Sequence, residues 1–363
     1  LSSIFSSSRE QEQLLSELFR RYGLCTHELL QDTGEEAAVE RFADGRAGGE
    51  MGVSAPGAAE EESRISTDEF INSEQTEVLY IPVKDGEIRV FHHVPGTSSD
   101  ERAASQENRP IVFLPGWGTI PEGFAEFLAA VYGQAECYYV ETREKNSSRL
   151  DRRRARMDMD QLAEDVQAVI DIAGPECGLM GTCWGSTIIA HGLASGILSA
   201  RTVVLFDPMH SLWFPKWLLN WLVPVVPLRL WKLIKPLGKR IALWGMQEPV
   251  QRARAELFID NADLWKWKHT ALQVQNVNLY NSMGRIQQEV LVMNGVKDKI
   301  HDRSHYPQLA VLAPKGRFFY LPVDEALRET LLGLVAVLFS IEEFGDHSDS
   351  MPAVLRQFER DLT

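Results

Sequence analysis

The feature that most constrains the fold is a regular alternation of short apolar segments and amphipathic segments between residues 110 and 344. Runs rich in β-branched and aromatic residues indicate strands, and apolar residues that recur every three or four positions indicate helices. The predicted strands are 77–83, 87–94, 110–115, 136–141, 177–182, 200–207, 289–295 and 317–323. The predicted helices are 121–133, 158–174, 184–198, 306–313 and 325–344. Such an alternation is typical of an α/β protein with a mostly parallel, doubly wound sheet.

The first two strands form an exception to the parallel pattern. They flank Lys84-Asp85-Gly86, a turn sequence that predicts an antiparallel hairpin. We therefore expect one sheet that begins with this hairpin and continues with about six parallel strands.

An acidic segment precedes the alternating region. Residues 1–75 carry 16 Asp or Glu residues and 6 Arg residues, which accounts for most of the net charge of −14. Apolar residues at helical spacing predict an amphipathic helix over 8–31, and the Gly-, Ala-, Glu- and Ser-rich stretch from 31 to about 72 predicts a flexible acidic linker. We divide the chain into this N-terminal segment, 1–75, and one α/β domain, 76–363. The acidic segment is a candidate docking tail for a partner.

Composition excludes several classes of protein. The negative net charge argues against a general nucleic-acid binder. The four cysteines form no CxxC pair, so neither a structural zinc site nor a disulfide scaffold is expected, and the pattern fits a reducing cytoplasm. No secretory signal is visible at the start of the sequence, and no HExxH motif is present. We expect a cytoplasmic protein without a metal or cofactor.

The strongest chemical motif lies at the turn after strand 177–182. Gly181-Thr182-Cys183-Trp184-Gly185 ends that strand and opens helix 184–198. Glycines two residues on either side of Cys183 allow a turn that is too sharp for larger residues. The helix N-terminus favours negative charge and so activates a thiol placed there. These features make Cys183 a candidate nucleophile.

This turn resembles G-x-S-x-G, the nucleophile elbow of the α/β-hydrolase fold, with Cys in place of Ser. Leu114-Pro115-Gly116-Trp117-Gly118 follows the third strand and is similar to the oxyanion loop of that family. The resemblance implies that the backbone N–H groups of Trp117 and Trp184 form the oxyanion hole, with Gly116 beside the substrate.

The resemblance also indicates which residue is the acid of the catalytic triad, and it shows that the usual histidine base is missing. Asp298 follows the penultimate strand, where the family carries its triad acid, and Asp207 at the end of an earlier strand is an alternative acid. The family has its catalytic histidine after the last strand, but residues 306–346 contain no histidine. His210 and His301 are the candidate substitutes. His210 follows strand 200–207, and His301 follows the candidate acid Asp298.

A long insertion, about residues 209–287, corresponds to the helical cap that α/β-hydrolases carry. It contains seven of the nine tryptophans, and Trp213 and Trp217 are candidate substrate-binding residues. Between Asp207 and Glu248 it has six Lys or Arg residues and no acidic residue. Its uncharged run over 217–228 is too short to cross a bilayer, so we expect at most peripheral membrane contact through the cap.

Two hypotheses for function follow. In the first, the chain is a hydrolase or acyltransferase that moves a lipophilic acyl group from a small-molecule ester or thioester through a Cys183 acyl-enzyme. Cysteine-elbow members of the family include polyhydroxyalkanoate synthases and dienelactone hydrolases. In the second, the chain is a catalytically degenerate α/β-hydrolase that acts as a ligand-binding or scaffold protein, which the missing histidine favours.

Overall fold

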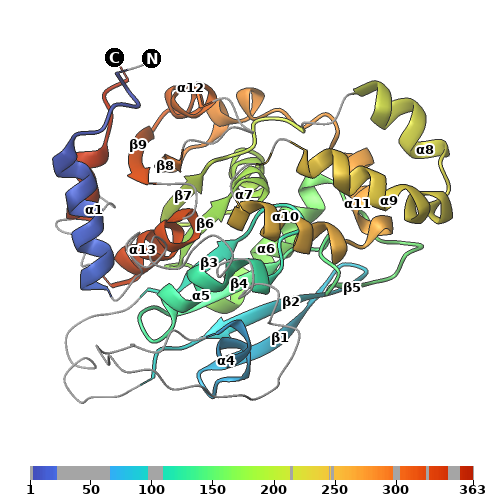
Figure 1. Ribbon diagram of the computed structural model, residues 1–363, viewed down its shortest axis with the longest axis horizontal. Coiled ribbons are helices and arrows are strands. Elements are labelled where there is room, and N and C mark those ends of the chain that lie inside the picture. The colour runs from blue at the N-terminus through green and yellow to red at the C-terminus, as the bar shows by residue number, and fades with distance from the viewer. Residues whose placement is uncertain are drawn as a thin grey trace.

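A single twisted sheet, flanked by helices on both faces, forms the centre of the molecule (Figure 1). The computed structural model describes residues 3–22, 66–96, 109–212, 216–244, 246, 249–296, 303–323, 327–341 and 352–362. Within these residues the predicted strands are confirmed to within two residues at each end. The strands are β1 (Thr76–Val83), β2 (Gly86–His93), β3 (Ile111–Leu114), β4 (Cys137–Glu141), β5 (Arg149–Leu150), β6 (Gly178–Thr182), β7 (Thr202–Phe206), β8 (Val290–Val296) and β9 (Gly316–Val323).

The strand order is that of a doubly wound sheet with an antiparallel start. The order is β1-β2-β4-β3-β6-β7-β8-β9, with the short strand β5 paired to β2. The β1–β2 hairpin is antiparallel, β2 is antiparallel to β4, and all pairs from β4 to β9 are parallel. The predicted α/β class and mostly parallel sheet are therefore confirmed. Parallel pairing aligns the carboxyl ends of β3, β6, β7 and β8 along one edge, where ligands bind in such sheets.

The core consists of two apolar layers, one on each face of the sheet. Alternation along β3 shows the division, since Val112 and Leu114 belong to one layer and Ile111 and Phe113 to the other. The first layer includes residues of α6 (Met159–Ala173), α7 (Trp184–Ala194) and α12 (His305–Leu312). The second includes residues of α5 (Ala125–Val131), which follows the 3₁₀ helix η1 (Pro121–Phe124), and of α13 (Arg328–Ile341).

The N-terminal helix is part of the second layer. Helix α1 (Arg9–Arg21) lies within the predicted 8–31 helix and begins with a capping box between Ser8 and Gln11. Leu15, Leu18 and Phe19 are buried in the same layer as α13. The apolar face of α1 is therefore used within the chain. Residues 23–65, which contain most of the predicted linker, lie outside the described residues.

The linker prediction fails at its C-terminal end. Residues Thr67–Asn72 form helix α4, which a second capping box between Ser66 and Glu69 opens. Phe70 is 1% exposed and packs against the rings of His93 and Tyr132. One large aromatic anchor and a good cap are enough to order this short polar sequence.

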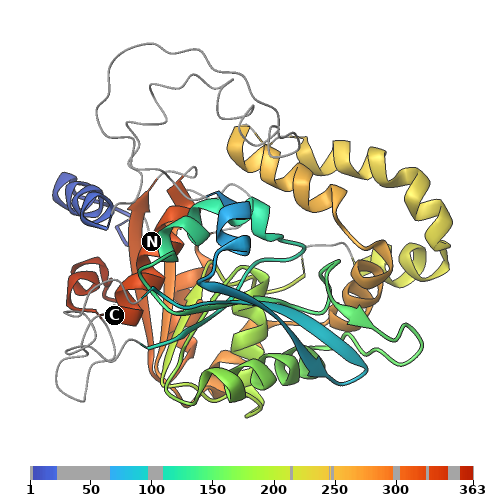
Figure 2. The same ribbon diagram turned by 90° about the horizontal axis from the view of Figure 1, so that it is seen from below.

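The insertion between β7 and β8 is helical, as expected, and projects away from the sheet (Figure 2). Its elements are the π-helix η2 (Leu218–Leu222), α8 (Val223–Val225), α9 (Leu228–Leu243), α10 (Pro249–Asp260), α11 (Leu264–Val274) and the 3₁₀ helices η3 (Leu279–Asn281) and η4 (Met283–Arg285). Leu219, Val223 and Ala271 form a small apolar cluster of their own. The last element, η6 (Ala353–Phe358), packs beside β9.

Candidate active site

Cys183 occupies a sharp turn between β6 and α7. Its backbone has φ 51° and ψ −111°, which is unfavourable for a residue with a side chain and persists only where the surroundings impose it. The Cys183 N–H donates to the carbonyl oxygen of Phe206 at 2.9 Å, and the N–H of Thr187 donates to the Cys183 carbonyl oxygen at 3.2 Å. The turn, residues 181–185, is thus held from the neighbouring strand and from its own helix, and its backbone is strained at Cys183. We call this turn the elbow.

The two glycines around Cys183 are required by close packing. A Cβ on Gly185 would lie 2.1 Å from the carbonyl oxygen of Leu114, and a Cβ on Gly181 would lie 2.6 Å from the backbone nitrogen of Ser186. Both contacts are with backbone atoms, which cannot move aside without displacing the strand or the helix. This explains the Gly-x-Cys-x-Gly spacing in physical terms.

The loop after β3 lies against the elbow. A Cβ built on Gly116 would lie 3.6 Å from the Cβ of Cys183. The rings of Trp117 and Trp184 meet edge to face with their centroids 5.0 Å apart, and Trp184 is fully buried. The structure therefore brings together Gly116, Trp117, Cys183 and Trp184. The assignment of the Trp117 and Trp184 N–H groups as oxyanion donors stays a prediction.

A buried lysine, which sequence reasoning missed, fixes this loop. The Lys145 ammonium donates to the carbonyl oxygen of Gly116 and forms an ion pair with Glu144 at 2.9 Å, and both side chains are fully buried. Adjacent Glu and Lys residues on a loop usually indicate a solvated pair, so the sequence carries no signal for this contact. The pair sets the position of Gly116, and through it the position of the loop beside Cys183.

A second buried lysine connects the cap to the same region. Lys266 of α11 donates through Nζ to the backbone carbonyl oxygens of Lys145 at 2.6 Å, Asn146 at 3.1 Å and Ser148 at 2.7 Å. Burial lowers the pKa of Lys266 to about 8, against the opposing influence of Asp263 and Glu144. A buried cation of the cap thus joins α11 to the loop at residues 145–148.

Asp207 is a buried acid beside the elbow, since it follows Phe206, whose carbonyl oxygen accepts from the Cys183 N–H. It follows β7, has φ 45° and is fully buried. Its carboxylate accepts from Nδ2 of Asn294 at 2.6 Å and from Nε of Arg328 at 3.1 Å. The Arg328 Nη2 also donates to the hydroxyl of Thr182 at 2.9 Å, and Thr182 precedes Cys183 in the chain. The network therefore joins the ends of β6, β7 and β8 to the start of α13.

No sequence motif points to Arg328 as a residue near Cys183. It opens the helix after β9, within a few residues of the place where the family resemblance puts its histidine. A guanidinium stays protonated in proteins and has no acceptor, so it cannot take a proton from Cys183. Its charge compensates the buried Asp207 and directs a cation toward the elbow. The acid that Arg328 contacts is Asp207, which is the alternative rather than the first choice from the sequence.

The remaining predicted site residues are placed as follows. Asp298, His301 and Trp213 lie outside the described residues. The ring of His210 stacks on that of His305, with centroids 3.8 Å apart, and the hydroxyl of Tyr280 hydrogen-bonds Nδ1 of His305. Trp217 is 65% exposed on the surface of the cap. The roles of His210 and Trp217 stay predictions.

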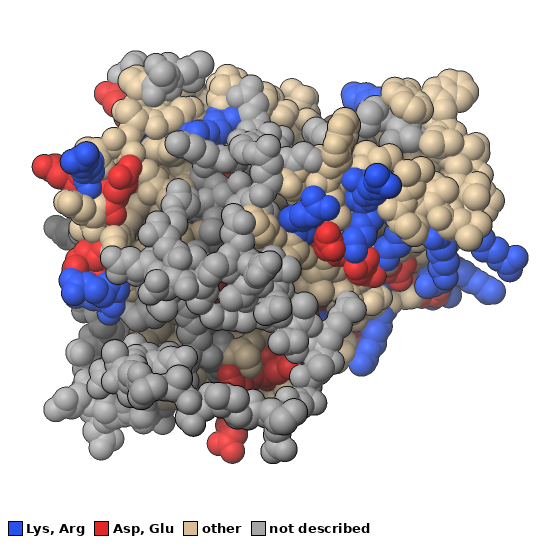
Figure 3. Space-filling model, in the orientation of Figure 1, with Lys and Arg blue, Asp and Glu red and all other residues tan. Residues whose placement is uncertain are grey.

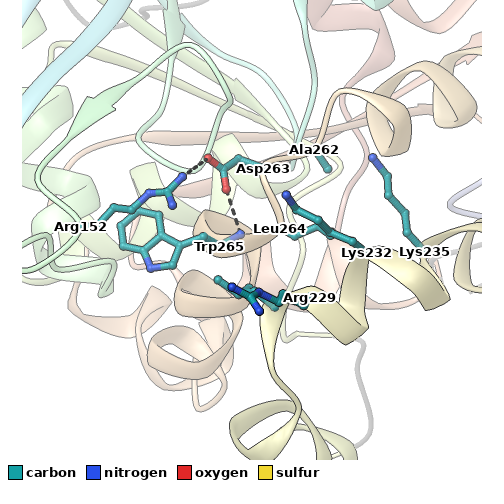
Figure 4. A pocket seen from close by; sticks show the side chains of 9 residues that line it. Arg152, Arg229, Lys232, Lys235, Ala262, Asp263, Leu264 and Trp265 are labelled. Carbon is teal, nitrogen blue, oxygen red and sulfur yellow. Dashed lines mark hydrogen bonds and ion pairs between the residues drawn. The ribbon is translucent and has the colours of Figure 1, made fainter.

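A separate basic cleft lies between α9 and α11 (Figure 4). It has a volume of about 550 Å³, and its charged and aromatic lining residues are Arg152, Arg229, Lys232, Lys235, Asp263 and Trp265. Asp263 accepts from the N–H of Trp265 at 2.8 Å and lies 3.8 Å from Arg152. The elbow residues do not line this cleft. Among the described residues, no group of three His, Cys, Asp or Glu side chains is arranged to hold a metal ion.

Solved structures with the same architecture are numerous. A hydrolase from Pseudomonas aeruginosa PA01 has a TM-score of 0.53 and 18% identity, over 73% of this chain and 98% of that chain. A thermophilic esterase from Thermogutta terrifontis has a TM-score of 0.53 and 14% identity, over 72% and 95%. The enol-lactonase from Burkholderia xenovorans LB400 has a TM-score of 0.51 and 17% identity, over 68% and 91%. No protein-family model and no curated protein matches the sequence. At these identities the likeness is one of fold.

Proposed function

We propose that this chain, which has the α/β-hydrolase fold of its structural neighbours, transfers or hydrolyses a lipophilic acyl group through a covalent intermediate on Cys183. The observation that carries the proposal is the strained backbone of Cys183 at φ 51°, in a turn whose flanking glycines leave no room for a Cβ. Strain of this kind is found where a chain must present a side chain at a functional site.

The reaction has two steps. The Cys183 sulfur attacks the carbonyl carbon of an ester or thioester, and the new C–S bond forms as the bond to the leaving alcohol or thiol breaks. The leaving group takes the proton that the Cys183 thiol gives up. Water or an acceptor alcohol then attacks the acyl-enzyme, which releases an acid or a new ester and returns a proton to the sulfur. The N–H groups of Trp117 and Trp184 are the proposed donors to the oxyanion in both steps.

The proton relay is the part of the proposal that rests on the sequence. Asp298 is the proposed acid, and His210 and His301 are the proposed bases. A thiol depends less on a base than a hydroxyl does, because part of it ionises near neutral pH. The release of the acyl group by water still needs a base, so these residues are tested by their effect on deacylation.

Aromatic side chains beside the elbow favour a substrate whose acyl group is apolar. The rings of Trp117 and Trp267 are 6.0 Å apart, and a Cβ on Gly118 would lie 2.1 Å from the Trp267 ring. Structural neighbours described as esterases, lipases and an enol-lactonase support an ester-type substrate in the same fold. We therefore propose esters or thioesters of acyl chains rather than of small polar acids.

The test is turnover of p-nitrophenyl esters of increasing acyl length by the full chain and by Cys183→Ala. That variant keeps Cys25, Cys137 and Cys177, so any loss of activity belongs to Cys183 alone. We expect turnover that rises with acyl length and disappears in Cys183→Ala. Equal turnover in both proteins would contradict the proposal.

The ion pair between Arg328 and Asp207 favours a second candidate function. An arginine in contact with this acid suits a chain that has kept the elbow as part of its fold and binds a ligand without turning it over. Formation and decay of a Cys183 acyl adduct would exclude this alternative. Binding of an acyl ester or thioester without any adduct or turnover would support it.

The acidic N-terminal segment adds a proposal about a partner. Because α1 packs its apolar face into the same layer as α13, a docking tail would use the acidic residues between α1 and α4. Deletion of residues 23–65 should then abolish association with a basic partner while leaving the fold intact. A cytoplasmic location is likewise proposed from the free thiols of Cys137 and Cys177.

A further inference from the structure

Helix α9 exposes its apolar side to solvent. Leu230, Leu233, Leu237, Ile241 and Trp244 recur at intervals of three or four residues along α9 and its C-cap, so they share one face. Leu233 is 75% exposed, Ile241 is 63% exposed and Trp244 is 89% exposed. An ordinary surface helix directs such a face toward the core.

The polar side of the same helix packs against the rest of the cap. Lys239 lies 2.8 Å from the carboxylate of Asp260 and 3.5 Å from that of Glu256, both on α10. Lys235 donates to the carbonyl oxygen of Asp260 at 2.8 Å. The buried Leu243 and the partly buried Trp231 lie on this inner side as well, so α9 is held with the face of Leu233, Leu237 and Ile241 outward.

The exposed apolar surface continues beyond α9. Of the fourteen large apolar side chains that are exposed in the described residues, nine lie between 217 and 244. We define these nine residues as the cap face: Trp217, Trp221, Leu222, Val225, Leu230, Leu233, Leu237, Ile241 and Trp244. Such a concentration is unusual for a surface that faces only water and marks an interaction site.

Positive charge surrounds the cap face. Arg229, Lys232 and Arg240 are exposed on α9, and Arg229 and Lys232 also line the basic cleft. Figure 3 shows Lys and Arg side chains along the edge of the uncharged surface of the cap. Residues 208–247 contain six Lys or Arg residues and no acidic residue, although the whole chain has a net charge of −14. The positive charge is therefore local to this segment.

We propose that the cap face docks on the surface of a membrane that contains anionic lipids. Aliphatic side chains of α9 would enter the boundary between headgroups and acyl chains, Trp221 and Trp244 would lie at the headgroup level, and Arg229, Lys232 and Arg240 would contact phosphates. The helix lies in the membrane plane. No helix among the described residues is long and apolar enough to cross a bilayer.

The charge around the cap face favours a lipid surface over a second copy of the chain as its binding partner. Two cap faces packed together would bring their cationic residues close to one another, and 208–247 offers no carboxylate to compensate them. Anionic headgroups supply that compensation and adapt to the shape of the face. Binding of the cap face to lipid is separate from the proposed acyl chemistry and is measured without an acyl substrate.

The test is cosedimentation of the full chain with vesicles of phosphatidylcholine alone and of phosphatidylcholine with phosphatidylglycerol. The test variant is Leu233→Gln/Leu237→Gln/Ile241→Gln. The matched control is Ile172→Gln/Val311→Gln, since Ile172 is 52% exposed and Val311 is 61% exposed outside the cap. Arg229→Gln/Arg240→Gln tests the charge, and Cys183→Ala tests whether binding is independent of the proposed chemistry.

We expect binding to the anionic vesicles that falls at least about tenfold in the triple variant and is unchanged in the control and in Cys183→Ala. The arginine variant should lose most of its preference for anionic vesicles and its salt dependence. Equal binding by the triple variant and the control would overturn the proposal. It would also be overturned by a dimer, seen in light scattering, that the triple variant abolishes while vesicles are not bound.

Discussion

Arg328 donates through Nε to the carboxylate of Asp207 at 3.1 Å and through Nη2 to the hydroxyl of Thr182 at 2.9 Å. One side chain thus connects the helix after the last strand, a buried acid and the residue before Cys183. Asp207 is 0% exposed, so its charge needs compensation, to which this cation and the amide of Asn294 contribute.

The first prediction concerns this pair. Arg328→Met should lower the free energy of unfolding by about 3 kcal/mol, because a buried carboxylate loses its cation. Adding Asp207→Asn should recover at least about 1 kcal/mol, since the buried charge is then gone. Urea denaturation of both single variants and the double variant measures the coupling. Strictly additive effects would show that the pair does not stabilise the fold.

The main chain around this network is predictable from the sequence, and the network itself is not. The strands, the sharp turn at Cys183 and the loop at Gly116 follow from local apolar periodicity and glycine spacing. Arg328 and Asn294 are distant from Asp207 in sequence and belong to no local motif. Long-range ion pairs of this kind appear only when the sheet edge brings the strand ends together.

The second prediction compares two helical glycines. Gly185→Ala should destabilise the fold by at least about 2 kcal/mol, because its Cβ would lie 2.1 Å from the carbonyl oxygen of Leu114. Gly238→Ala on α9 should instead stabilise it by about 0.5–1 kcal/mol, because a Cβ built on Gly238 would have no atom within 4 Å apart from its chain neighbours and its own helix backbone. Thermal and urea denaturation test both variants. Similar effects in the two would contradict the packing account of the elbow.

The third prediction concerns Lys145 as a positioning residue. Lys145→Met removes the donor to the Gly116 carbonyl oxygen, so the loop beside Cys183 loses its fixed position. We expect kcat for the proposed ester turnover to fall about tenfold or more with little change in KM. Lys268→Met is the control, since the Nζ of Lys268 donates to the carbonyl oxygens of Pro224 and Val226, which both lie in the cap. An unchanged kcat in a folded Lys145→Met variant would refute this role.

The fourth prediction is a pH dependence of stability that comes from His93. This side chain is fully buried, and its Nε2 accepts from the N–H of Gly133 at 2.9 Å, so the neutral ring is the form that fits. Burial, with a smaller contribution from His92, lowers the pKa of His93 from 6.5 to about 4. The unfolded chain therefore binds the extra proton first as the pH falls.

The sign of the effect follows from that shift. The contribution of His93 to stability is fully present above about pH 6.5 and is lost as the pH falls from 6.5 through about 4. His93→Gln keeps a hydrogen-bonding side chain without this titration, so its free energy of unfolding should decline less steeply in the same window. Urea denaturation at several pH values gives the two slopes, and equal slopes would contradict the assignment.

The cap illustrates a second limit of sequence reasoning. The sequence shows that 228–243 is amphipathic, and amphipathicity alone predicts that the apolar side faces the core. In the structure α9 has the opposite orientation, with Lys239 paired to Glu256 and Asp260 and with Leu243 buried on the inner side. The N-terminal helix α1 follows the usual rule that the apolar side faces the core, since Leu15, Leu18 and Phe19 are buried in the same layer as α13.

The central claim is that Cys183 carries the acyl group, and intact-mass spectrometry tests it most directly. The full chain is mixed with a long-chain p-nitrophenyl ester or acyl thioester and quenched in acid at short times, and Cys183→Ala is treated in the same way. We predict one added acyl mass that maps to Cys183, decays on further incubation and is absent from the variant. An adduct of equal yield in Cys183→Ala, or equal turnover of the ester by Cys183→Ala and the full chain, would contradict the account.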